Sequence, residues 1–75
     1  MRMTRGTLWI TVDGRAIRAQ GEAYLRGGSS PDFDLYENSI VEWDDGGPVS
    51  DAERARIIDA ILAEAKKRGL NIEVV

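Results

Sequence analysis

Hydrophobic and polar residues alternate near the N-terminus, where Trp9 and Thr11 separate Leu8, Ile10 and Val12. A period of two predicts a β-strand with one buried face. The next dipeptide, Asp13-Gly14, is favoured in two-residue type I′ turns, whose central residues both need a positive φ. Such a turn places the apolar residues of two strands on one face, through the pairs Val12–Arg15, Ile10–Ile17 and Leu8–Ala19. We therefore predict a hairpin whose second strand runs through Gly21, at a bend or bulge, to Leu25.

The middle of the chain predicts short elements separated by turns. Residues 27–31 are a loop by composition, and Phe33 and Leu35 alternate with polar residues in a third strand over 32–36. A turn over 37–39 follows. Residues 40–43 predict a short fourth strand, although the spacing of Ile40 and Trp43 also fits one helical turn. Residues 44–48 are a Gly/Pro-rich break.

A helix is predicted from a capping box, in which Ser50 and Glu53 satisfy each other's backbone amides. It should run to about Arg68, and Gly69 supplies a left-handed cap with Leu70 folded back on Ala65. Its predicted buried stripe has apolar residues at helical spacing, namely Ala55, Ile58, Ile61, Leu62 and Ala65, with Ile57 at the margin. A last strand over 71–75 turns Ile72 and Val74 inward.

These elements predict an α+β fold in the order β-β-β-(β)-α-β, with one helix packed on a face of a small antiparallel sheet of three to five strands. Seventy-five residues leave room for one core, so residues 1–75 form a single domain. The strand order, and the place where residues 72–75 join the sheet, stay open.

Composition argues against catalysis. The chain has neither cysteine nor histidine, which removes the thiol nucleophile, the usual general base and the commonest metal ligand. Asp32 and Asp34 have the spacing that begins a calcium loop, but Tyr36 and Glu37 occupy the positions of the next ligand and of the glycine. No phosphate-binding glycine motif occurs. We expect no enzyme activity, no metal and no cofactor.

Charge is unevenly distributed along the chain. The net charge of −3 combines +3 over residues 1–26, −8 over residues 27–53 and +2 over residues 54–75. Asp51 and Glu53 are explained by the start of the helix. Acids around aromatic anchors suit the capture of a basic protein partner. The predicted partner-binding surface comprises the remaining acids and two aromatic residues: Asp32, Asp34, Tyr36, Glu37, Glu42, Trp43, Asp44 and Asp45.

Two alternatives stay open. The acids could merely keep a small domain soluble while Tyr36 and Trp43 complete the core. The outer face of the hairpin could instead stack single-stranded nucleic acid, through Trp9, Thr11, Arg18, Gln20, Tyr24 and Arg26. The same residues could form cross-strand pairs or a homodimer contact. The negative net charge argues against nucleic acid as the partner.

No apolar stretch is long enough for a secretory signal or a membrane span, so we expect a cytoplasmic protein without membrane contact.

Several short motifs, taken in order, resemble the immunity protein 74 family of bacterial polymorphic toxin systems. They are Thr4-Arg5-Gly6, Asp13-Gly14, Gly21-Glu22, Ser39-Ile40, Trp43 before a Gly/Pro-rich loop, the helix from Ser50 and a short closing strand. The match departs from the family pattern after Trp43, where Asp44-Asp45-Gly46-Gly47 precedes Pro48. The resemblance implies a cytoplasmic antidote, without catalytic residues, that neutralises a cognate toxin by direct non-covalent binding.

Overall fold

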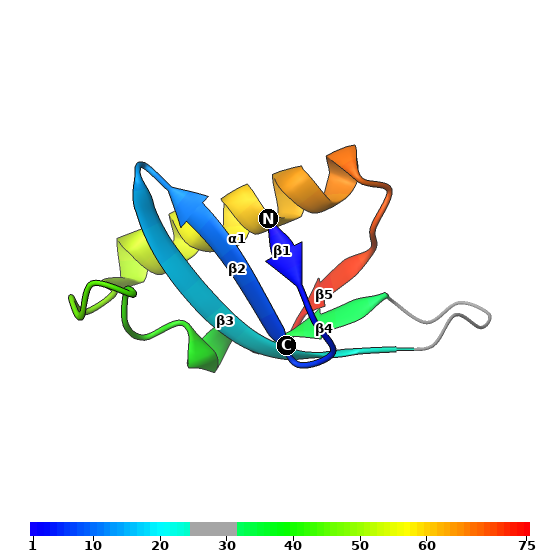
Figure 1. The fold of residues 1–75 in the computed structure, drawn as a ribbon, viewed down its shortest axis with the longest axis horizontal. Coiled ribbons are helices and arrows are strands. Elements are labelled where there is room, and N and C mark those ends of the chain that lie inside the picture. The colour runs from blue at the N-terminus through cyan, green and yellow to red at the C-terminus, as the bar shows by residue number, and fades with distance from the viewer. Residues whose placement is uncertain (25–31) are drawn as a thin grey trace.

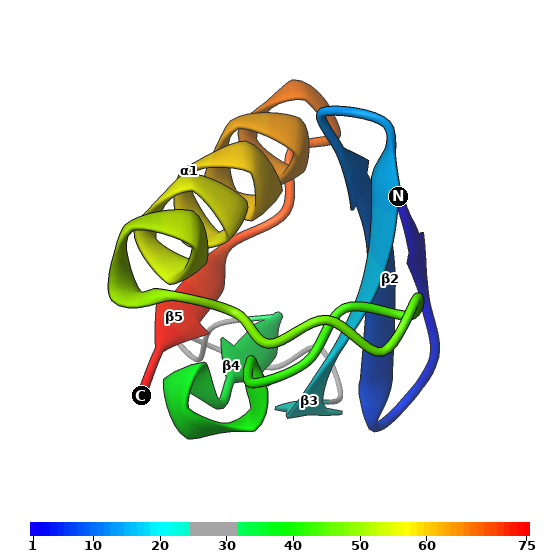
Figure 2. The same cartoon turned by 90° about the vertical axis from the view of Figure 1, so that its left-hand side faces the viewer.

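The computed structural model describes residues 1–24 and 32–75, which form one sheet and one long helix (Figure 1). The elements in chain order are β1 (Arg2–Met3), β2 (Thr7–Val12), β3 (Arg15–Ala23), β4 (Phe33–Leu35), the 3₁₀ turn η1 (Glu37–Ser39), α1 (Asp51–Lys67) and β5 (Ile72–Val74). The five strands lie in the sheet in the order in which they occur in the chain. The predicted α+β class is confirmed, and α1 covers the concave face of the sheet (Figure 2).

The sheet is mixed rather than wholly antiparallel. The pairs β1–β2, β2–β3 and β3–β4 are antiparallel, whereas β4 and β5 are parallel. Parallel neighbours need a long crossover, and α1 with its flanking loops supplies it between β4 and β5. This crossover settles where the last strand joins the sheet.

The predicted hairpin is confirmed, with Val12 opposite Arg15, Ile10 opposite Ile17 and Leu8 opposite Ala19. Asp13 (φ 53°) and Gly14 (φ 80°) both have the positive φ of a type I′ turn. The sequence did not predict β1, because two residues are too few to show a period.

Gly21 marks the point where β3 exchanges one partner for another. β3 pairs with β2 as far as Gln20 and with β4 from Gly21 onward. A Cβ atom at Gly21 would overlap the backbone oxygen of Asp34 and would lie 2.5 Å from Cζ of Phe33. The glycine thus permits a close approach of β4 to β3 without interrupting the strand. Leu25, the predicted end of this strand, and the predicted loop 27–31 lie outside the described residues.

The segment between β4 and α1 has the predicted turn over 37–39 but differs from prediction over 40–43. Residues 37–39 form a 3₁₀ turn, and residues 40–43 are neither a strand element nor a helical turn. Two isolated bridges hold them instead, Ile17 with Trp43 and Glu42 with Pro48. Because one bridge joins this segment to β3, it extends the sheet locally without a continuous ladder.

The helix has the predicted caps but a different buried face. The Ser50–Glu53 capping box is present, and the amides of Gly69 and Leu70 donate to Lys66 and Ala65 in a Schellman arrangement.

The buried line of the helix is Ile57, Ile61 and Ala65, while Ala55 and Leu62 are exposed and Ile58 is half-buried. The predicted stripe was therefore wrong by a rotation of the helix about its axis. The predicted and the observed buried faces of α1 both contain Ile61 and Ala65. Only the packing of α1 against the sheet decides between the two faces.

The core lies between α1 and the concave face of the sheet. Its fully buried side chains come from β2, β3 and β4, from the loop after η1 and from α1: Leu8, Ile17, Phe33, Leu35, Ile40, Ile57 and Ile61. Ile72 is buried and Val74 is half-buried against this cluster, as predicted. The outward-facing residues of β3, β4 and β5 are left uncovered by the helix.

Candidate functional site

The eight residues predicted to form one acidic surface do not gather in one place. Asp32, Asp34 and Tyr36 lie on or beside β4, and Glu37 begins η1. The other four, Glu42 to Asp45, lie in the loop that precedes α1. The structure therefore separates the predicted surface into a β4 part and a loop part.

Trp43 is a core residue, not an exposed anchor. Its exposed fraction is 4%, and it belongs to the buried cluster. Its backbone bridges Ile17 on β3, and the guanidinium of Arg15 covers its ring at 4.2 Å from the centroid. The expectation that this ring offers contact area to a partner is wrong, because packing against β3 and Arg15 already uses the ring.

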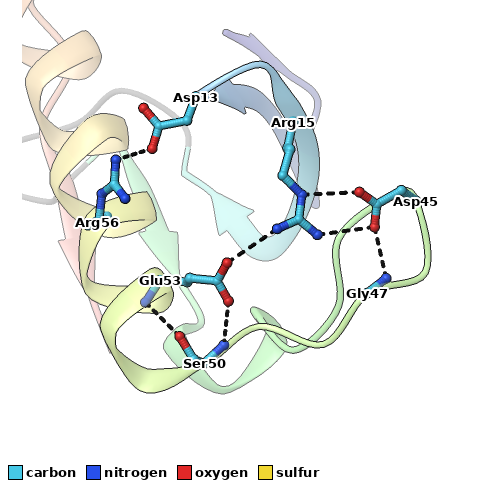
Figure 3. Close-up of polar contacts among 7 residues, drawn as sticks. All are labelled: Asp13, Arg15, Asp45, Gly47, Ser50, Glu53 and Arg56. Carbon is cyan, nitrogen blue, oxygen red and sulfur yellow. Dashed lines mark hydrogen bonds and ion pairs between the residues drawn. The ribbon is translucent and has the colours of Figure 1, made fainter.

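Asp45 is held by the same arginine. Arg15 Nε and Nη2 donate to Asp45 Oδ2 and Oδ1 at 3.1 and 3.2 Å, and Arg15 Nη1 donates to Glu53 at 3.2 Å (Figure 3). Hydrogen bonds from Arg15 and from the backbone amide of Gly47 lower the pKa of Asp45. Asp45 thus ties the loop to the hairpin.

Figure 3 shows that these contacts join the hairpin turn, the loop and the first turns of α1. Arg56 pairs with Asp13 across the end of the molecule, and Glu53 accepts from the backbone amide of Ser50, which lowers the pKa of Glu53. These side chains and Trp43 border a pocket of about 160 Å³. Each charged side chain around the pocket forms an ion pair with another residue. These side chains therefore form a structural network.

Glu42 and Asp44 lie together on the outer surface beside β3. The Ile17–Trp43 bridge sets them next to Arg18 and Ala16, and the amide of Asp44 donates to the Ala16 carbonyl. Both line an open groove of about 470 Å³ that Arg18 also borders. The neighbouring arginine reduces the negative potential of this part of the predicted surface.

The β4 part forms a denser acidic group than the sequence predicted. Register places Glu22 directly opposite Asp34, and Asp34 directly opposite Glu73. Phe33 and Leu35 point into the core, so Asp34 and its two neighbours point outward. We call Glu22, Asp34 and Glu73 the carboxylate row.

The carboxylate row spans three neighbouring strands at a spacing of about 4.8 Å per strand. Among the described residues, none of the ion pairs includes a member of the row. Like charges directly opposite each other destabilise a sheet. The row is therefore a concentrated negative charge that the described part of the chain does not neutralise.

Two tyrosines flank the row, each 40% exposed. The Tyr24 hydroxyl donates to Asp34 Oδ2 at 2.5 Å, and the Tyr36 hydroxyl donates to Glu22 at 3.4 Å. The bond to Asp34 raises the pKa of Tyr24 to about 12. Burial and the charge of Glu22 raise the pKa of Tyr36. Both rings therefore stay neutral and present aromatic area beside the carboxylates.

The family model of immunity protein 74 matches residues 1–75, the whole chain. The chain belongs to the immunity protein 74 family. No curated protein and no solved structure matches it. The description of the family indicates an immunity function.

This member of the immunity protein 74 family carries features that sequence reasoning missed. Glu22 and Glu73 lie in segments with a net positive charge, so a count of charge along the chain did not reveal them. A usable signal was present, because Glu22-Ala23-Tyr24 and Asp34-Leu35-Tyr36 repeat an acid-x-Tyr pattern on two strands. In antiparallel strands such repeats place two acids and two tyrosines on one face.

Two other acids of the predicted surface, Asp32 and Glu37, lie outside the carboxylate row. Asp32 accepts from the backbone amide of Asn71 at 2.8 Å, which fixes the start of β5 against β4. Glu37 lies apart from the carboxylate row, in a groove it shares with Asp51 and Arg54 of α1. Neither residue stands in register with the carboxylate row.

The residues considered for nucleic-acid stacking are divided, because Tyr24 flanks the carboxylate row whereas Trp9 and Arg18 pair with each other on β2 and β3. Arg2, Trp9 and Arg18 stand in register on β1, β2 and β3, and the Arg2 guanidinium lies 4.3 Å from the Trp9 ring centroid. Arg26 is outside the described residues. Within those residues, no group of three or more acids is arranged to hold a metal, and no helix is long and apolar enough to span a membrane.

Proposed function

We propose that this immunity protein neutralises a cognate bacterial toxin of a polymorphic toxin system by direct non-covalent binding. It acts in the cytoplasm and transforms no substrate. The contact surface is the outer face of β3, β4 and β5, centred on the carboxylate row. The observation that carries the proposal is that three in-register carboxylates, none of them in an ion pair among residues 1–24 and 32–75, lie beside two exposed tyrosines.

Electrostatics and packing both favour a basic toxin surface as the partner. A concentrated negative charge accelerates encounter with a positive surface, and tyrosines contribute buried area once contact is made. The described ion pairs do not reduce this charge, so it is available to a partner.

Co-expression tests the proposal. A candidate toxin from a neighbouring reading frame is expressed with and without the immunity protein, and cell growth is measured. The association rate is then measured with the two purified proteins. Glu73→Lys reverses a member of the row, and Asp59→Lys on the exposed side of α1 is the matched control, because both change net charge equally.

We expect Glu73→Lys to lower the association rate about tenfold or more at low salt, and Asp59→Lys to change it little. Urea unfolding of both variants checks that they fold. The proposal fails if the wild-type protein neither binds nor protects against the toxin, or if the two variants associate at the same rate.

A second candidate function is favoured by the alignment of Arg2, Trp9 and Arg18, which suits single-stranded nucleic acid. Filter binding to oligonucleotides at two salt concentrations tests it, since the binding must weaken steeply with salt. We prefer the toxin, because Arg2 already occupies a face of the Trp9 ring on which a base would stack.

A further inference from the structure

β5 is an edge strand with one side of its backbone open. It lies at the end of the sheet opposite β1 (Figure 2), and β4 is its only strand partner in the described part of the chain. The Asn71 carbonyl and the Val75 amide both bond to the β4 segment. Because backbone groups alternate in direction along a strand, the amides and carbonyls of Ile72 and Val74 point away from β4. Such an edge is a template for an added strand.

An apolar flank of α1 lies on the same side of the molecule as this edge. Arg56 pairs with Asp13 on the hairpin side of the helix, so Ile58, two residues further on at about 100° per residue, lies on the opposite side. Ile58 lines an open groove with Glu37, whose amide bonds to the residue after β5. Leu62 follows one turn later and is 37% exposed. We call Ile58 and Leu62 the apolar flank.

The two faces of β5 differ in chemistry. Ile72 is buried and Val74 is half-buried on the face that turns toward the core, whereas Glu73 between them is exposed on the outer face. Glu73 takes part in none of the ion pairs among the described residues. A strand added beside β5 therefore meets an apolar surface on its inner face and a carboxylate on its outer face.

We propose that an extended segment of the toxin adds to β5 as an antiparallel strand, an inference that rests on the proposed function. Apolar residues of this segment bond to the backbone of Ile72 and Val74 and pack toward the apolar flank. A lysine or arginine between them stands opposite Glu73 as a non-hydrogen-bonded pair, in which side chains approach most closely. Backbone bonds then supply affinity, and the alternating side chains supply selectivity.

A second copy of this chain fits the edge less well than a basic segment. Two β5 strands paired antiparallel along their full length would bond through Ile72 and Val74 and would place the two Glu73 side chains opposite each other. Like charges directly opposite destabilise a sheet. The charge of the edge therefore favours a strand that carries a cation at this position.

Peptide titration tests the edge without the toxin. Acetyl-Val-Lys-Val-Lys-Val-amide is added to the ¹⁵N-labelled protein, and the amide shifts of Ile72 and Val74 are followed. The same peptide N-methylated at its valines lacks the backbone donors, and a glutamate-for-lysine peptide reverses its charge. We expect saturable shifts with the first peptide and binding weaker by about tenfold or more with each control.

Val74→Pro removes the outward amide, while the amides of Glu73 and Val75 remain for the β4 ladder. Val74→Ala is the matched control, because it shortens the same side chain but keeps the amide. We expect Val74→Pro to weaken toxin binding by about tenfold or more relative to Val74→Ala. In the wild type, the toxin should slow hydrogen exchange at the amides of Ile72 and Val74.

Urea unfolding checks that Val74→Pro folds. If it does not, Leu62→Lys replaces it, with Ala63→Lys as the control, because Ala63 is exposed and lies off the apolar flank. Leu62→Lys should weaken toxin binding by about tenfold or more, and Ala63→Lys should change it little.

The inference is overturned if the toxin binds while the amides of Ile72 and Val74 exchange as in the free protein, or if each test variant binds the toxin as its control does. Toxin neutralisation stands in that case. If the wild-type protein does not bind the toxin, the proposed function fails and the peptides decide. Saturable binding that needs the backbone donors supports strand addition at β5, and absence of binding overturns it.

Discussion

Replacing Gly21 by alanine should destabilise the protein, because β4 approaches β3 too closely there to admit a side chain. The added Cβ would overlap the backbone oxygen of Asp34 and would crowd the Phe33 ring, whose Cζ would be only 2.5 Å away. A backbone atom cannot rotate out of the way, so the two strands must separate. Gly6→Ala is the matched control, since its nearest neighbouring atom would lie at 3.7 Å, an ordinary contact.

The magnitude follows from two opposing effects. Overpacking costs about 1–3 kcal/mol, and a backbone clash belongs at the upper end of that range. Alanine also restricts the unfolded chain more than glycine does, which stabilises the folded state by about 0.4–1 kcal/mol. The net expectation for Gly21→Ala is a loss of about 2 kcal/mol, out of a total of about 4–11 kcal/mol for a domain of this size. Gly6→Ala should be neutral or slightly stabilising.

Urea unfolding followed by tryptophan fluorescence measures the difference, because Trp43 is buried in the folded state. For a small domain with a slope of about 1–2 kcal/mol/M, the midpoint of Gly21→Ala should fall by about 1–2 M. If Gly21→Ala and Gly6→Ala unfold at the same midpoint, the close approach of β4 to β3 at Gly21 is refuted.

Three further measurements test other parts of the structure. Ile61→Ala should lower the free energy of unfolding by about 2–5 kcal/mol, whereas Leu62→Ala, at a side chain that is 37% exposed, should change it much less; equal losses in urea unfolding would contradict the buried face of α1. Asp45 and Glu53 have lowered pKa values, so the stability they contribute is complete above their ordinary pKa values of 3.8 and 4.5 and is lost as the pH falls below them. Arg15→Met should reduce the part of that loss that comes from Asp45, because Arg15 is the largest cause of the lowered pKa there, whereas the Ser50 amide is the largest cause at Glu53; an unchanged pH profile in urea unfolding would contradict the network. Absorbance titration should show Tyr24 ionising near pH 12, and Asp34→Asn should return its pKa toward 10; no change in that variant would exclude the hydrogen bond as the cause.

The elements predicted from sequence are those that short-range chemistry determines. Asp13-Gly14 needs only its own backbone preference to form the turn, and Ser50 and Glu53 cap the helix through contacts three residues apart. The parallel pairing of β5 and the rotation of α1 depend on how distant segments pack. No local pattern contains that information, which explains why the helix face was predicted incorrectly.

Only part of the candidate site was predicted, because its other residues come together through the pairing of distant strands. Asp34 and Tyr36 were assigned to an acidic surface from their neighbours in sequence, and whether they bind a partner stays a prediction. Glu22 and Glu73 are 12 and 39 residues from Asp34 along the chain, and register alone brings them together. Trp43 was assigned to the surface because acids surround it in sequence, although its ring faces the core.

The distribution of ion pairs separates structural charge from charge available for binding. All ion pairs among the described residues involve α1 or the loop before it, where arginines oppose acids across the hairpin turn, the loop and the helix. In the carboxylate row on β3, β4 and β5, acid opposes acid, and none of the described ion pairs includes these acids. A protein under selection for stability alone would favour a cation opposite Asp34, because opposite charges in register stabilise a sheet and like charges do not. The unfavourable arrangement is explained if the missing cation belongs to the partner, and in that case binding the partner should stabilise this face against local unfolding more than any other part of the sheet.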